Sequence, residues 1–108
     1  WSVSSVNPLD AIQVAVTRVA LDAPASAPAW LPDERLDLTT ALEAYTRGGA
    51  FAESTGREKG WLAPGTLADL AVLSDDIFTV PADRLPGLSS LLTVVGGTIV
   101  YDAGVLPH

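Results

Sequence analysis

The sequence predicts an α+β fold in which two helices are followed by a small β-sheet that ends in a hairpin. In the first half of the chain, apolar residues recur at spacings of three and four, which is the period of an amphipathic helix. After Gly60 this spacing gives way to short runs of apolar and β-branched residues separated by turn residues. The last two of these runs are separated by only a pair of glycines, which is typical of a tight hairpin.

The first helix is expected to begin after Asn7, behind a loop over residues 1–7. Asparagine caps free backbone N–H groups, and Pro8 suits the first helical position because no donor is needed there. The helical spacing continues to Leu21, with one apolar stripe formed by Leu9, Ile12, Val16 and Ala20. Residues 22–33 follow with three prolines, so we expect an extended connector, anchored to a core by Trp30 and Leu31.

The second helix is expected to begin at Asp37, a favourable N-cap, and to continue to about Ser54. Its apolar stripe contains Leu38, Ala41, Leu42, Tyr45 and Gly49. The pair Gly48–Gly49 weakens an isolated helix by roughly 1 kcal/mol per residue, so an end at Gly48 is the alternative. Within a longer helix, Gly49 would let another segment pack closely.

The second half of the chain predicts three strands. Pro64–Gly65 forms a turn before a strand over residues 67–74, which is apolar enough for burial on both faces. Residues 81–89 are expected to be a loop with at most one helical turn at 82–85. Residues 91–95 and 98–102 then form a hairpin with a primed turn at Gly96–Gly97.

The composition excludes several kinds of site within this chain. There is no Cys, and the single His is His108, so a zinc site or a His-based catalytic triad is not expected among these 108 residues. The net charge of −7 argues against nucleic acid and anionic membranes as partners, and no apolar run reaches the length of a membrane span. We expect Tyr45 and the tryptophans to lie in the core, and no residue of the chain to be catalytic.

Residues 60–73, Gly-Trp-Leu-Ala-Pro-Gly-Thr-Leu-Ala-Asp-Leu-Ala-Val-Leu, resemble a stretch near the C-terminus of metal-dependent amidohydrolases. Residues 92–101 resemble the hairpin that follows it in that superfamily, and residues 36–50 resemble its late helix. Residues 7–18 are similar to the YtcJ-like branch, amidohydrolase family 3. The motif residues that carry the resemblance, with expected structural roles, are Pro64, Gly65, Ala68, Asp69, Leu70, Gly96 and Gly97.

The resemblance implies that residues 1–59 come from the end of a (β/α)8 barrel, also called a TIM barrel, and residues 60–108 from a β-sandwich domain. It implies a parent hydrolase that cleaves carbon–nitrogen bonds other than peptide bonds with a divalent metal, usually zinc, which activates a water molecule. The family's metal ligands and catalytic Asp would precede Trp1, so no metal or cofactor is expected in this chain. Only the first residues, with Trp1, Ser2 and Ser4 as candidates, would lie near the substrate.

The expected partner is therefore the missing N-terminal part of the same protein, and the isolated chain is expected to be inactive and to self-associate. We expect the absence of Met at the start to reflect truncation, and a cytoplasmic location is expected. The alternative is a free-standing acidic α+β interaction module without enzymatic activity. Amides, cyclic amides and carbamates all remain open as substrates of the parent.

Overall fold

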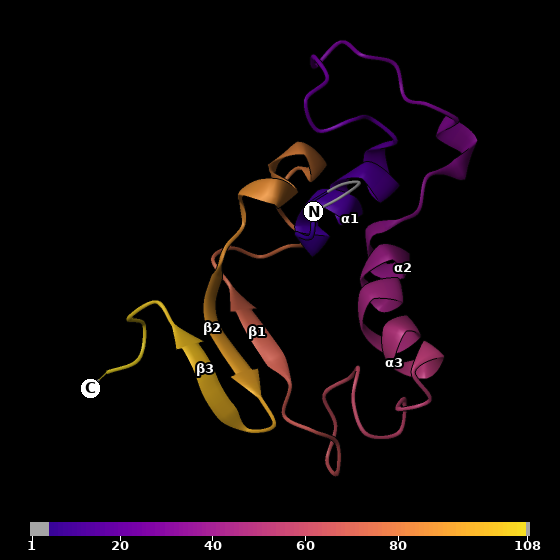
Figure 1. Cartoon of the computed structure of the whole chain (residues 1–108). Coiled ribbons are helices and arrows are strands. Elements are labelled where there is room, and N and C mark those ends of the chain that lie inside the picture. Colours follow the sequence, from indigo (N-terminus) through magenta and orange to yellow (C-terminus); the bar gives the residue numbers. More distant parts are fainter. Residues whose placement is uncertain (1–4, 108) are drawn as a thin grey trace.

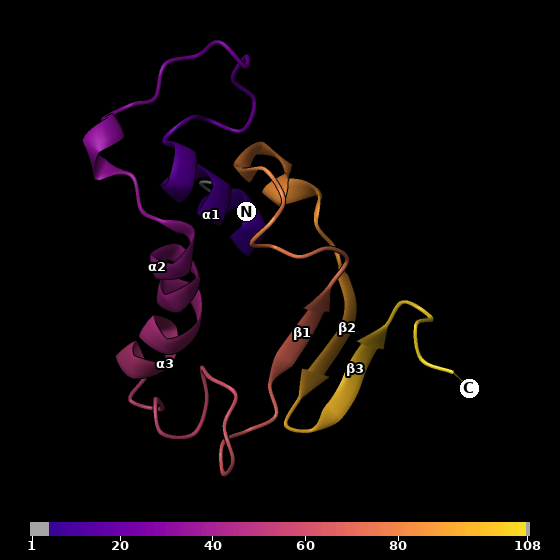
Figure 2. The ribbon, with the colours of Figure 1, turned by 180° about the vertical axis from the view of Figure 1, so that it is seen from behind.

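The structure, a computed structural model that describes residues 5–107, is α+β as predicted (Figure 1). Its elements are α1 (Pro8–Thr17), η1 (Pro32–Glu34), α2 (Leu38–Glu43), η2 (Ala44–Gly48), α3 (Gly49–Ala52), β1 (Leu70–Leu73), η3 (Ala82–Gly87), β2 (Ser90–Val95) and β3 (Thr98–Asp102). The views from the front and from behind show α1 and η3 side by side, with the α2–α3 helix and the sheet extending from them (Figures 1 and 2). Residues 53–69 connect the far ends of these two arms.

The start of α1 is confirmed, but the predicted end at Leu21 is wrong. The Asn7 side chain accepts the Leu9 N–H at 3.1 Å, and Pro8 occupies the first turn. The helix ends at Thr17 because Arg18 takes a left-handed conformation with φ 58°. Arg18 then exchanges hydrogen bonds with Trp30: its carbonyl accepts the Trp30 N–H at 2.8 Å, and its Nε donates to the Trp30 carbonyl at 3.0 Å.

The connector after α1 is less extended and less buried than predicted. Residues 32–34 form the 3₁₀ turn η1, entered through Leu31 at a left-handed φ of 50°. Trp30 is 71% exposed and Leu31 52% exposed, so neither anchors the connector in the core. The Trp30 ring lies instead under the Arg18 guanidinium, 4.8 Å from the ring centroid, where the cation faces the negative face of the indole.

The second helix continues through its glycine pair, as predicted. The Asp37 carboxylate accepts the Thr40 N–H at 2.8 Å and caps α2. The segment η2 is π-helical, a wider turn that joins α2 to α3 without breaking the helix. The helix ends at Ala52, and Ser54 adopts φ 63° just after it, which reverses the chain.

The three strands form an antiparallel sheet in the order β1-β2-β3. Strand β1 is shorter than predicted because the Leu67 N–H donates to the Glu58 carbonyl at 2.7 Å instead of to a neighbouring strand. The hairpin is confirmed: Gly96 and Gly97 have φ values of 56° and 79°, the positive pair that a type I′ turn requires. The helical segment η3 is longer than the single turn predicted for 82–85 and includes Pro86.

The core lies where α1, α2 and η3 meet the end of β1. Its buried members are Ile12, Ala41, Leu85 and Leu88, with Leu73 packed against them. The expected burial of β1 on both faces is wrong, because neighbouring residues Ala71 and Val72, on opposite faces, are both exposed. Tyr45, 53% exposed, and Trp61, 44% exposed, are likewise outside the core.

Candidate functional site

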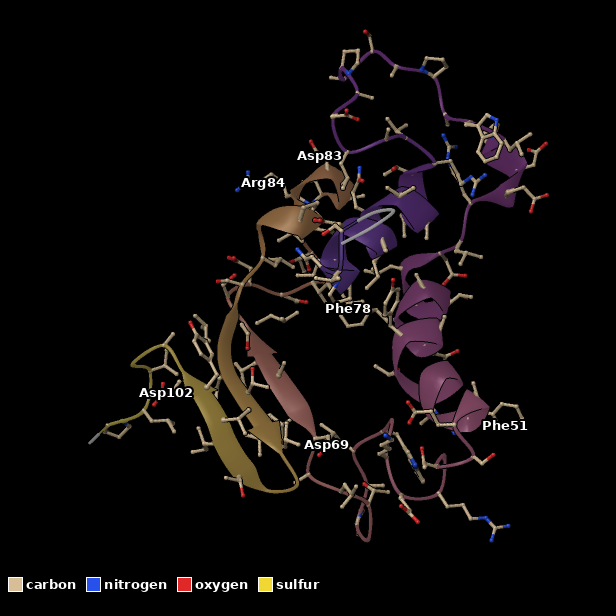
Figure 3. The ribbon with its side chains drawn as sticks, viewed as in Figure 1. Phe51, Asp69, Phe78, Asp83, Arg84 and Asp102 are labelled. Carbon is tan, nitrogen blue, oxygen red and sulfur yellow. The ribbon has the colours of Figure 1, made fainter. Side chains whose placement is uncertain are left out.

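The motif at residues 64–70 holds the hairpin turn against the start of β1. The Asp69 carboxylate accepts the Gly96 N–H at 2.7 Å, and the Ala68 carbonyl accepts the Gly97 N–H at 3.1 Å. These two bonds join residues that are 27 and 29 positions apart, at the end of the sheet where Asp69 is labelled (Figure 3). Asp69 and Ala68 therefore fix the position of the turn, and Leu70 begins β1 directly after them.

The turn at Pro64–Gly65 precedes this contact. Gly65 has φ +89°, and the Thr66 N–H closes the turn by donating to the Ala63 carbonyl at 3.1 Å. The Thr66 hydroxyl lies 2.8 Å from the same carbonyl and 3.1 Å from the Trp61 carbonyl. The turn thus directs the chain from the loop that contains Trp61 into β1.

A cleft of about 330 Å³ separates the α2–α3 helix from the segment that leads into β1. Its polar lining includes Glu53, Lys59 and Asp69, and its remaining lining comes from Tyr45, Thr46, Gly49, Ala50 and Gly60. Lys59 Nζ lies 2.7 Å from Glu53 Oε2. This hydrogen bond and the attraction between the two charges lower the pKa of Glu53 and raise the pKa of Lys59.

Gly60 forms the close approach at this cleft. A Cβ atom there would lie 2.8 Å from the Ala50 Cβ and 3.0 Å from the Thr46 carbonyl oxygen. By contrast, a Cβ on Gly49 would meet only the Ala44 carbonyl oxygen of its own helix, at 3.9 Å. The close packing that we expected at Gly49 is therefore supplied by Gly60 from the facing segment.

The charged groups of this cleft are the ion pair of Lys59 with Glu53 and the Asp69 carboxylate, which is bonded to the hairpin turn. These contacts hold segments of the chain together. Within residues 5–107, no three His, Cys, Asp or Glu side chains come together in a way that could hold a metal ion. The substrate-loop candidates Trp1, Ser2 and Ser4 lie outside the residues that the structure describes. Among the described helices, none has the length and apolar character needed to cross a membrane.

No pattern in the sequence indicated the pairing of Glu53 with Lys59. The two residues are six apart, a spacing that does not place side chains together on a helix. They meet because the chain reverses at Ser54. Arg18 occupies the C-cap of α1 and contacts Trp30.

Comparison with known proteins places this geometry in context. The sequence profile of the amidohydrolase family matches residues 1–101. The chain is 38% identical over 101 residues to Protein LONG AFTER FAR-RED 3 of Arabidopsis thaliana, a match that covers 94% of this chain and 17% of that protein. It is 34% identical over 100 residues to the putative amidohydrolase YtcJ of Bacillus subtilis (strain 168), covering 93% of this chain and 19% of that protein.

A third relative is the N-substituted formamide deformylase of Arthrobacter pascens, 36% identical over 86 residues, with 80% of this chain and 16% of that protein covered. The chain thus spans less than a fifth of the length of these curated relatives. No solved structure matches it.

Proposed function

The chain belongs to the amidohydrolase family, and from this premise we propose that it is the C-terminal part of a longer metal-dependent hydrolase. The proposed reaction is the hydrolysis of carbon–nitrogen bonds other than peptide bonds. The observation that carries the proposal is the extent of the family match, which includes the helical half of the chain and its strands in one continuous range. Relatives named as an amidohydrolase and a deformylase support the same class of reaction.

In this proposal the chain has a structural role in the hydrolase. Residues 1–59 supply the last helices of the catalytic barrel, and residues 60–108 supply strands of a β-sandwich. The apolar surface of the chain supports this role: Phe51 is 82% exposed and points away from α3 (Figure 3), and Val72, Ile99 and Val100 of the sheet are 44–59% exposed. Apolar surface of this extent is typical of an interface, and we assign it to the N-terminal part of the same protein.

The divalent metal of the proposed hydrolase, zinc in our assignment, does not fit the residues described here. The donor set of residues 5–107 includes no group of three potential ligands. The metal ligands and the catalytic residues would therefore belong to other parts of the longer protein, and no catalytic step is assigned to this chain.

The substrate class to test first is the N-substituted formamides. The deformylase of Arthrobacter pascens carries that substrate in its name and matches 80% of this chain. Cyclic amides and carbamates are the next classes, because each contains a carbon–nitrogen bond next to a carbonyl that can be hydrolysed.

The gene sequence immediately upstream of the Trp1 codon tests the proposal. We expect an in-frame Gly-Ser-Asp next to Trp1 and a His-x-His pair further upstream. A start codon adjacent to Trp1 would contradict the proposal and favour a free-standing acidic interaction module. Metal analysis provides a second test, in which the isolated 108-residue chain is expected to carry no stoichiometric zinc.

A further inference from the structure

We draw no further inference here: the strongest candidate, the surface hollow beside the end of α3 that Arg47, Phe51 and Arg57 line, is open to solvent, and no side-chain polar atom of residues 5–107 is buried there without a partner, so nothing in it points to a ligand.

Discussion

The substitution Gly60→Ala tests the packing between the α2–α3 helix and the segment that leads into β1. Gly60 adopts φ +94°, and an added Cβ would lie 2.8 Å from the Ala50 Cβ, 3.0 Å from the Thr46 oxygen and 3.1 Å from the Arg47 Cα. Two of these three atoms belong to the backbone, so they cannot move aside without shifting the helix. We therefore expect a large loss of stability.

Two costs add at this position. The left-handed conformation costs an alanine about 1–2 kcal/mol relative to glycine. Forcing an extra carbon into a tightly packed contact typically costs a further 1–3 kcal/mol or so. Gly65→Ala is the matched control, because Gly65 has a similar φ of +89° and nothing lies within 4 Å of its added Cβ. The control isolates the conformational cost.

Urea unfolding followed by circular dichroism measures both variants. We expect Gly60→Ala to lose about 2–5 kcal/mol and Gly65→Ala about 1–2 kcal/mol of unfolding free energy. In thermal unfolding, a gap of about 1 kcal/mol corresponds to roughly 4 °C or more for a domain of this size. Equal losses in the two variants would refute the close approach of Gly60 to the helix.

Three further predictions concern the hairpin, the cap of α2 and association. Asp69→Ala should lower the unfolding free energy by about 1 kcal/mol and speed hydrogen exchange at the Gly96 amide. Asp69→Asn keeps an acceptor, so its loss of unfolding free energy should be smaller. Unchanged exchange in Asp69→Ala would contradict the contact. Hydrogen bonds from Thr40 hold the pKa of Asp37 below its ordinary 3.8. The stability that this cap contributes is therefore complete above pH 3.8 and is lost as the pH falls through the lowered pKa. Asp37→Asn should reduce this loss in an acid titration, and an identical loss would argue against the cap. The exposed apolar sheet and its unpaired edges should make the isolated chain self-associate, so its sedimentation coefficient should rise with concentration, and a constant monomer value would count against this.

The elements that the sequence predicted correctly are those fixed by nearby residues. Asn7 caps α1 two residues ahead, Asp37 caps α2 three residues ahead, and the glycine pair at 96–97 sets the hairpin turn by itself. In each case the side chain or the conformational freedom that forms the structure lies within the same short segment. Local patterns of this kind are visible without tertiary contacts.

The errors arose where distant residues decide the outcome. The end of α1 depends on contacts between Arg18 and Trp30, twelve residues apart, which replace the last helical turn. Strand β1 has a sequence suited to burial, yet Ala71 and Val72 are exposed, because burial depends on segments that pack against the strand. In our proposal those segments belong to the longer protein.

The candidate site shows the same division. The position of Asp69 at the hairpin follows from a motif in the sequence, although its partner Gly96 lies 27 residues away. The pairing of Glu53 with Lys59 had no signal in the sequence, because the two residues meet only where the chain reverses at Ser54.

A hydrolysis assay tests the central claim most directly. N-substituted formamides, cyclic amides and carbamates are offered separately to the longer protein that we propose and to the isolated 108-residue chain, with supplied zinc, and amine release is measured. The account predicts turnover of at least one class by the longer protein and none by the isolated chain. Turnover by the isolated chain, or a longer protein inactive on every class, would contradict it.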